Sequence, residues 1–166
     1  LAVVGSRTEP EHIDSVREAV EGNAQLRLRG VLEACAARGA AFDSRLVMST
    51  GQDWTIGSGA RITQQLIDSG IPFDGIVAFN DQLALGALFT LAANGISVPE
   101  QMQVIGFDNI EEAAYFQPPL TTMDSRLDWT APTAVNRILG RIDGSITKPE
   151  LLTTESQVIA RATTRV

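Results

Sequence analysis

Short apolar runs alternate with longer helical patterns along most of this chain, and this order limits the folds that it can adopt. Four runs have the length and the β-branched content of buried strands: Leu1–Val4, Leu46–Ser49, Ile76–Phe79 and Val104–Phe107. Three segments between them have a helical pattern: Leu26–Arg38, Trp54–Ser69 and Gln82–Ala93. Strands that alternate with helices form a parallel sheet with right-handed crossovers. The sequence therefore predicts an α/β fold, a parallel sheet with helices on both faces.

After Phe107 the regular alternation ends. Two short segments follow, a helix at Glu111–Phe116 and an extended piece at Leu120–Met123. A longer helix is predicted from Thr130 to Ile142, with Pro132 tolerated in its first turn. The alternation of residues Leu151–Ala160 predicts a final strand. Near the start of the chain, the polar, acidic stretch Ser6–Ala24 is expected to hold a short helix.

The composition excludes several classes of function. Thirteen basic against 20 acidic residues give a net charge of −7, which is unsuited to gripping a phosphate backbone. A single His and a single Cys cannot form a metal cluster or a His-based catalytic triad, so we expect neither an enzyme nor a cofactor or metal site. No run approaches the roughly 20 apolar residues that span a bilayer, so no membrane association is expected. The chain opens without Met on a strand-like run, and we expect it to be part of a longer protein.

Polar residues follow each predicted strand at the point where it ends. They are Gly5-Ser6-Arg7, Thr50-Gly51-Gln52-Asp53-Trp54, Asn80-Asp81 and Asp108-Asn109. The carboxyl ends of parallel strands share one edge of the sheet, where open α/β folds bind ligands. One short acceptor at each helix start is an ordinary cap, and we assign that role to Asp81. The second polar residue exceeds what a cap requires, so Asn80 and Asp108 are expected to face a ligand.

Two further residues suit a polar ligand at this edge. Arg27 is predicted to start a helix there, where a cation opposes the helix dipole and a purely structural role is disfavoured. Its five donors in a fixed fork match hydroxyls or a carboxylate. Trp54 offers a flat face for a sugar ring or a base; the alternative is a core side chain with its N–H satisfied.

These residues form a pattern that closely resembles the effector-binding core of LacI-family transcriptional regulators. The stretch IVAFNDQLALGAL is followed, in the family's order and spacing, by NGISVPEQMQVIGFDNIEEAAYFQPPLTTM. The resemblance extends from Arg27 onward and implies the fold of type I periplasmic binding proteins, in which a ligand lies between two α/β subdomains. It implies three parts of this chain: most of the C-terminal subdomain at residues 1–123, a crossover and helix of the N-terminal subdomain at 124–148, and a returning strand and tail at 149–166.

The resemblance also implies roles for individual residues. Arg27, Trp54, Asn80 and Asp108 match the family's ligand contacts, and Ser6, Asp53 and Leu127 are further candidates. Four residues match positions at the family's dimer contact: Leu85, Leu88, Tyr115 and Phe116. The alternative for Leu85 and Leu88 is that they face the chain's own sheet. The implied protein is a cytoplasmic homodimer, a repressor, that senses a small polar effector, and it binds operator DNA only through a domain outside these residues.

Three departures from the family pattern concern the pocket and its surroundings. The acidic stretch Ser6–Ala24 is longer than the family's usual link, Val31 replaces a common aromatic residue, and Leu127 stands where a Phe often closes the site. The effector therefore stays open: a sugar or sugar derivative is expected, and a purine or an organic acid remains an alternative. A type I solute-binding protein of a sugar transporter, which shares the fold and the cleft, is the alternative function.

Overall fold

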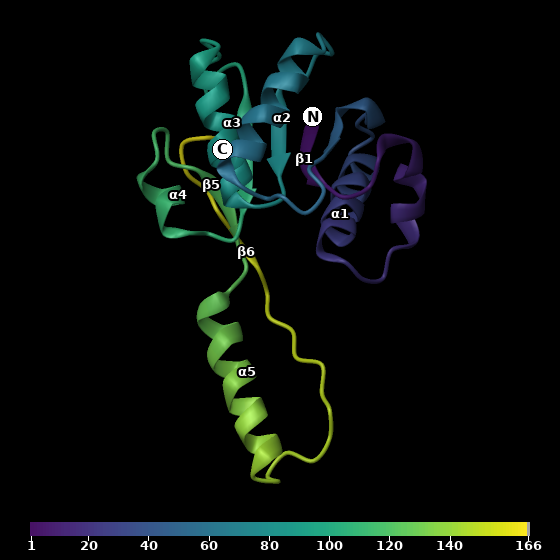
Figure 1. Cartoon of the computed structure of the whole chain (residues 1–166), viewed down its shortest axis with the longest axis vertical. Coiled ribbons are helices and arrows are strands. Elements are labelled where there is room, and N and C mark those ends of the chain that lie inside the picture. Colours follow the sequence, from purple (N-terminus) through teal and green to yellow (C-terminus); the bar gives the residue numbers. More distant parts are fainter. Residues whose placement is uncertain (166) are drawn as a thin grey trace.

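The core of the molecule is one six-stranded sheet (Figure 1). In the computed structural model, which describes residues 1–165, the strands lie in the order β2-β1-β3-β4-β5-β6. Their bounds are β1 (Ala2–Ser6), β2 (Val47–Ser49), β3 (Gly75–Ala78), β4 (Gln103–Phe107), β5 (Thr121–Asp124) and β6 (Gln157–Ile159). The first five strands are parallel, and β6 pairs antiparallel with β5. The α/β prediction is confirmed, and the last strand makes the sheet mixed.

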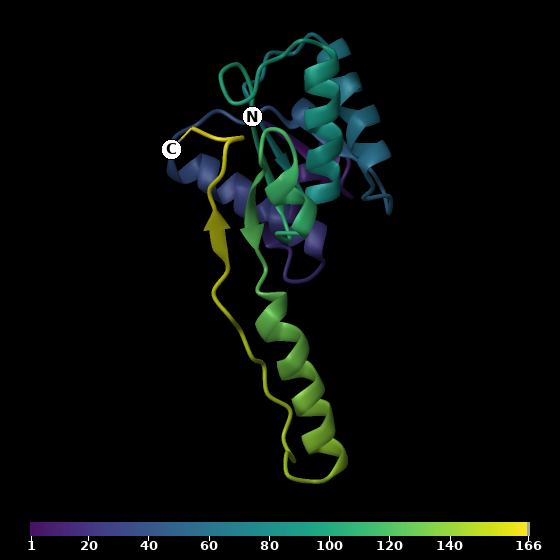
Figure 2. The same ribbon diagram turned by 90° about the vertical axis from the view of Figure 1, so that its left-hand side faces the viewer.

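Helices cover both faces of the sheet because the strands β1, β3 and β4 carry apolar side chains on both sides. Ala2 and Val4 of β1 belong to a core cluster beneath α2 (Ile56–Asp68) and α3 (Asp81–Ala93). Val3 points the other way, into a second cluster with α1 (Asn23–Ala37). Figure 2 shows α2 and α3 on one side of the sheet and α1 on the other.

Helices α2 and α3 pack with their backbones in contact. A Cβ atom added at Gly59 would lie 2.2 Å from the carbonyl oxygen of Leu83, and one added at Gly86 would lie 2.1 Å from that of Ile56. No side chain fits at either position, so the two glycines set the closeness of this helix pair. The pair in turn fixes the start of α3, where the polar residues of the expected site lie.

The acidic stretch between β1 and α1 forms a 3-10 helix, η1 (Pro10–Glu18), which agrees with the expectation of a short helix there. Its Val16 is buried in the same cluster as Leu28 and Leu32 of α1. The remaining short elements are η2 (Ser44–Leu46) before β2 and α4 (Glu111–Tyr115) after β4. Through Val16 the insertion is part of the α1 layer of the fold.

Helix α5 (Leu127–Ile142) and the chain that follows it extend away from the body (Figure 1). The chain leaves through β5 and returns beside α5 to β6 (Figure 2). Helix α5 exposes Val135, Ile138 and Leu139, each by more than half of its surface. None of the described helices is long and apolar enough to cross a membrane.

The predicted bounds of α5 and of the last strand were wrong. Helix α5 begins at Leu127 rather than Thr130, because the chain turns at Arg126 (φ 55°) and the Arg126 carbonyl accepts hydrogen bonds from the backbone N–H groups of Trp129 and Thr130. Pro132 is therefore the sixth helical residue and lies beyond the first turn. The final strand is only Gln157–Ile159, because β5 offers partners for just these three residues.

Candidate functional site

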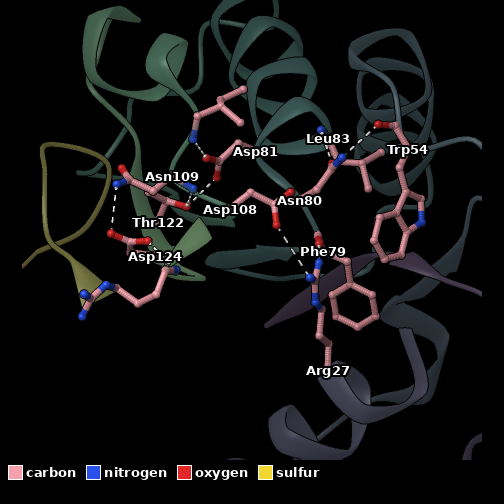
Figure 3. A network of polar contacts seen from close by, with 12 residues as sticks. Arg27, Trp54, Phe79, Asn80, Asp81, Leu83, Asp108, Asn109, Thr122 and Asp124 are labelled. Carbon is pink, nitrogen blue, oxygen red and sulfur yellow. Dashed lines mark hydrogen bonds and ion pairs between the residues drawn. The ribbon is translucent and has the colours of Figure 1, made fainter. Parts of the chain in front are cut away.

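The Arg27 side chain reaches from α1 to the polar edge of the sheet, toward Phe79 and Asp108 (Figure 3). Its guanidinium donates a hydrogen bond to the carbonyl oxygen of Phe79, at the end of β3, and forms an ion pair of 3.7 Å with Asp108, after β4. The same group lies 3.6 Å from the ring centroid of Phe107. Because α1 begins at Asn23, Arg27 stands in the second turn and does not start the helix as predicted. One side chain thus joins α1 to the ends of two strands.

Burial dominates the electrostatics of Arg27 and Asp108. Desolvation lowers the pKa of Arg27 below its ordinary value, although the carboxylates of Asp108 and Asp81 act in the opposite direction. Desolvation likewise raises the pKa of Asp108; Arg27 partly offsets this rise, and the charge of Asp81 adds to it. An ion pair of 3.7 Å is longer than a direct hydrogen bond. The pair therefore retains donor and acceptor capacity for a polar ligand.

A strained turn presents Asp108. Its φ is 118°, and Asn109 follows with φ 57°, both in a region that non-glycine residues rarely adopt. The backbone N–H of Asp108 donates to the Met123 carbonyl at 2.9 Å, which holds the turn against β5. Strain of this kind persists where the surrounding structure imposes it, often at ligand sites. The turn aims the Asp108 carboxylate toward Arg27 (Figure 3).

Trp54 and Asn80 form the other side of the site. The Trp54 indole N–H donates to the Gly5 carbonyl at 3.0 Å, and the ring meets Phe79 edge-on at 6.3 Å. The Arg27 guanidinium lies 5.4 Å from the Trp54 ring. The amide N–H of Asn80 donates to the Trp54 carbonyl at 3.0 Å, and its Oδ1 accepts from the Leu83 backbone N–H at 2.8 Å. Asn80 is half-buried and fixes Trp54 to the start of α3.

The cap of α3 is Asn80, and the prediction that Asp81 fills this role was wrong. Asp81 is fully buried and accepts hydrogen bonds from the Ile110 backbone N–H at 2.9 Å and from the Thr122 hydroxyl at 2.5 Å. The reason lies in β4, where a Cβ atom at Gly106 would lie 2.1 Å from the Asp81 carboxylate. The glycine leaves room for the carboxylate to turn into the sheet.

An apolar hollow of about 670 Å³ opens beside Arg27, between α1 and strands β3 and β4. Its lining includes Val31, Phe79, Phe107 and Met123. Val31 is the position at which the family commonly has an aromatic residue, and here the shorter side chain borders the hollow. Arg27 therefore stands between a polar edge and an apolar recess.

The three further candidates have other surroundings. Ser6 is buried, and its hydroxyl donates to the Thr8 carbonyl at 2.9 Å. The Asp53 carboxylate accepts a hydrogen bond from the Ser58 hydroxyl in α2, which lowers the pKa of Asp53. Leu127 is exposed at the start of α5. The structure brings Arg27, Trp54, Asn80 and Asp108 together, whereas these three make no hydrogen bond or ion pair with them among the described residues.

The expected dimer residues divide into two groups. Leu85 and Leu88 are each 3% exposed and belong to the core cluster of their own chain, as the alternative held. They are not available to a partner, because they pack in the core cluster with residues of α2 and of the sheet. Tyr115 is 78% exposed, and Phe116 is half-buried. On α3 the large exposed side chain is Phe89.

Three residues that contact this part of the structure were not among the candidates chosen from the sequence. Phe107 lies beneath Arg27, and Arg7 lies 5.3 Å from the Trp54 ring centroid. Arg161, far along the chain, donates a hydrogen bond to the Asn109 side chain at 2.8 Å. Phe107 could have been found as the last residue of an apolar strand at the binding edge, but nothing local to Arg161 predicts its partner. Within residues 1–165, no three His, Cys, Asp or Glu side chains gather as metal ligands would.

The fold and the site together define the class of the protein. The chain belongs to the family of periplasmic binding protein-like domains, whose model matches residues 8–164. Among its relatives is the HTH-type transcriptional regulator AscG of Escherichia coli K12, 36% identical over 123 residues, which cover 74% of this chain and 36% of AscG. The resemblance to LacI-family regulators is thereby confirmed.

Solved structures of LacI-type regulators have the same fold. A LacI-type transcription regulator from Bifidobacterium animalis subsp. lactis superposes with a TM-score of 0.91 at 34% identity, over 99% of this chain and 59% of that one. The complex of the transcriptional regulator CelR with cellobiose has a TM-score of 0.81 at 28% identity, over 98% of this chain and 46% of that one. The chain thus spans less than two thirds of the length of each of these relatives.

Proposed function

We propose that the chain is the effector-binding part of a LacI-type transcriptional regulator, a repressor that senses a small polar molecule of the sugar class. The observation that carries this proposal is the Arg27–Asp108 pair, held at the carboxyl edge of the sheet beside Trp54 and Asn80. A fork of donors, a carboxylate acceptor and an aromatic face together suit the hydroxyls and the ring of a sugar. That the similar regulator CelR was solved with cellobiose supports the sugar class.

We further propose that residues 1–123 form the C-terminal subdomain and that residues 124–148, with α5, belong to the N-terminal subdomain of the full-length protein. Residues 149–166 would return to the sheet. The position of α5 outside the body (Figure 1) and its exposed apolar residues support this division. The effector would then bind between the Arg27–Asp108 edge and a second wall, to which α5 would contribute and of which the rest would lie outside this chain.

Assembly and DNA binding are also proposals about the full-length protein. We propose a homodimer with Tyr115 and Phe116 at the contact, since Tyr115 is the most exposed aromatic side chain of the body. Operator DNA would be bound by a separate domain, because the net charge of −7 gives these residues no electrostatic attraction to phosphates. A protein that binds operators acts in the cytoplasm. Light scattering on a Tyr115→Glu variant tests the contact: the variant should be monomeric, and an intact dimer would exclude Tyr115.

The test of the function uses the full-length protein and a panel of mono- and disaccharides. Isothermal titration calorimetry should find a sugar that binds, and fluorescence anisotropy with labelled operator should show that this sugar changes operator affinity. Residues 1–166 alone should bind no operator and should bind the sugar more weakly. Tight, salt-sensitive DNA binding by these residues alone would contradict the proposal. A full-length protein that binds a sugar but no DNA would instead favour the solute-binding protein of a transporter.

A further inference from the structure

The Asn109 side chain connects the two chain segments through which α5 is attached. Its Oδ1 accepts a hydrogen bond from the Arg161 guanidinium at 2.8 Å, and its Nδ2 donates to the Asp124 carboxylate at 3.4 Å. Asp124 ends β5, the strand that leads out to α5, and Arg161 follows β6, the strand that returns. One amide thus bridges the outgoing and the returning segment (Figure 3 shows its contact with Asp124).

Both partners of Asn109 are themselves fixed to the backbone. Arg161 donates to the Leu120 carbonyl at 2.8 Å, and its own backbone N–H donates to the Thr121 hydroxyl at 2.8 Å. The second carboxylate oxygen of Asp124 accepts from the backbone N–H of Arg126 at 2.7 Å. Arg126 is the residue from which α5 begins. The hydrogen bonds therefore run without a break from Asn109 to the first turn of α5.

Asn109 is also connected to the polar edge of the sheet, where Asp108 lies. It follows Asp108 directly, and the two residues share the strained turn after β4. The Asn109 backbone N–H donates to the Thr122 hydroxyl at 3.4 Å, and that hydroxyl donates to buried Asp81 at 2.5 Å. A movement of Asp108 that improves its contact with a ligand must rotate the same turn and so displace the Asn109 amide.

The chemistry of the partners suits an amide at this position. Arg161 can only donate, and an ionised Asp124 can only accept, so the group between them must accept on one side and donate on the other. Asn meets both demands and also tolerates the left-handed backbone at φ 57°. A carboxylate would keep Arg161 but repel Asp124, and an alanine would lose both contacts.

We propose that Asn109 is a positioning residue that transmits effector contact at Asp108 to the orientation of α5. Because Asn109 holds the outgoing and the returning segment together, a shift of the turn moves both segments in one direction, and α5 follows as a unit. This inference rests on the proposed function, in which α5 belongs to the second wall of the effector cleft.

The test measures coupling in the full-length protein with the sugar identified above. The dissociation constant of the sugar is determined by calorimetry with and without saturating operator DNA. The larger of the two constants divided by the smaller is the coupling factor, which equals 1 when the two ligands do not affect each other. Asn109→Asp should lower this ratio by about fivefold, within the range of typical allosteric couplings. The affinity for the sugar without DNA should change less than about threefold, since Arg27 and Asp108 are retained.

A reciprocal exchange provides the rescue. In the double variant Asn109→Asp with Asp124→Asn, the amide and the carboxylate trade places, Arg161 keeps an acceptor at residue 109, and coupling should return. Asn94→Asp is the matched control, because the Asn94 amide also makes two hydrogen bonds, to Gln64 and to the Thr90 carbonyl, but at the far end of α3. It should leave the ratio unchanged. If Asn109→Asp does not fold, Arg161→Lys, which keeps the charge and loses the fork, should lower the ratio in the same way.

The outcomes separate this inference from the proposed function. A wild-type protein that binds both ligands without coupling overturns the proposed function and this inference with it. A coupled wild type with unchanged coupling in Asn109→Asp and Arg161→Lys overturns the inference alone. So does an equal loss of sugar affinity with and without DNA that the exchange fails to restore, because that result describes a purely structural residue.

Discussion

At the scale of single residues, Arg27 and Asp108 hold opposite charges in a half-buried place where neither is fully compensated. Arg27→Ala and Asp108→Ala in the full-length protein should each weaken effector binding by about 2–3 kcal/mol. Each substitution removes one charged partner of the ligand and leaves the charge of the remaining residue unpaired in a half-buried site. Calorimetry measures the loss. Arg45→Ala is the control, since Arg45 pairs with Asp43 on the exposed surface and should not affect the effector. Unchanged affinity in both test variants would remove this pair from the site.

The raised pKa of Asp108 gives effector binding a pH dependence with a defined sign. Ligand hydroxyls that donate to the carboxylate stabilise its charged form and lower its pKa in the complex. Binding should therefore release protons at a pH between the two pKa values, and affinity should fall as the pH drops through the pKa of the effector-free protein. Calorimetry in buffers of different ionisation enthalpy measures the proton release. Asp108→Asn should abolish it; a release that persists in this variant would assign the titration to another group.

The stability of the effector-free fold depends on pH with the opposite sign. A carboxyl whose pKa is higher in the folded than in the unfolded chain binds its proton more readily when folded. Asp108 by itself therefore stabilises the fold as the pH falls through its folded pKa, and this contribution is absent at neutral pH, where the buried group is charged. Ligand hydroxyls that donate to the Asp108 carboxylate would stabilise its charge, which Arg27 offsets only in part in the effector-free protein.

The neighbours Asn80 and Asp81 show how far sequence reasoning reaches at this scale. That a pair of polar residues stands at the strand end was correct, and so was the gathering of Arg27, Trp54, Asn80 and Asp108. Which member of the pair caps α3 could not be predicted, because it depends on Gly106, a residue of another strand that leaves space for Asp81. Local propensity treats Asn and Asp as equal caps, and the tertiary contact decides between them.

At the scale of the elements, the contact of α2 with α3 depends on two glycines. Gly86→Ala should lower the free energy of unfolding by about 1–3 kcal/mol, because the added methyl group meets the Ile56 carbonyl and forces the helices apart. Denaturant titration with circular dichroism measures the change. Gly30→Ala is the matched control: it lies in α1 with nothing within 4 Å of the added atom, and it should stabilise the chain by about 0.5–1 kcal/mol. A neutral Gly86→Ala would show that the helices can separate freely.

The order and the type of the elements followed from the sequence, but some orientations did not. The β-branched runs and the helical spacing predicted the strands β1–β4 and the helices between them. Helix α3 is so uniformly apolar that its periodicity distinguishes no buried face, and the assignment of Leu85 and Leu88 to a dimer contact came from the resemblance. Contacts with α2 and the sheet, which are not local, bury both leucines.

At the scale of the whole molecule, α5 carries apolar side chains that residues 1–165 leave uncovered. Val135 and Leu139 stand one turn apart, and each is 55% exposed. The double variant Val135→Lys with Leu139→Glu should improve the solubility of the isolated chain, since it removes exposed apolar surface. In the full-length protein the same variant should lower the melting temperature by several degrees if, as proposed above, α5 is buried there in the other subdomain. Scanning calorimetry of the two forms decides: equal effects would show that α5 stays exposed in both.

The antiparallel pairing of β6 with β5 has a consequence for synthesis on the ribosome. Until residues 157–159 emerge, β5 is the open edge of the sheet, and such an edge is a template for pairing with another nascent chain. The residues that follow complete the closure, since the Thr163 hydroxyl donates to the Val104 carbonyl at 2.7 Å and also accepts from the Thr121 backbone N–H at 2.8 Å. A chain terminated before residue 157 should therefore accumulate in inclusion bodies, although it still carries Arg27, Trp54, Asn80 and Asp108.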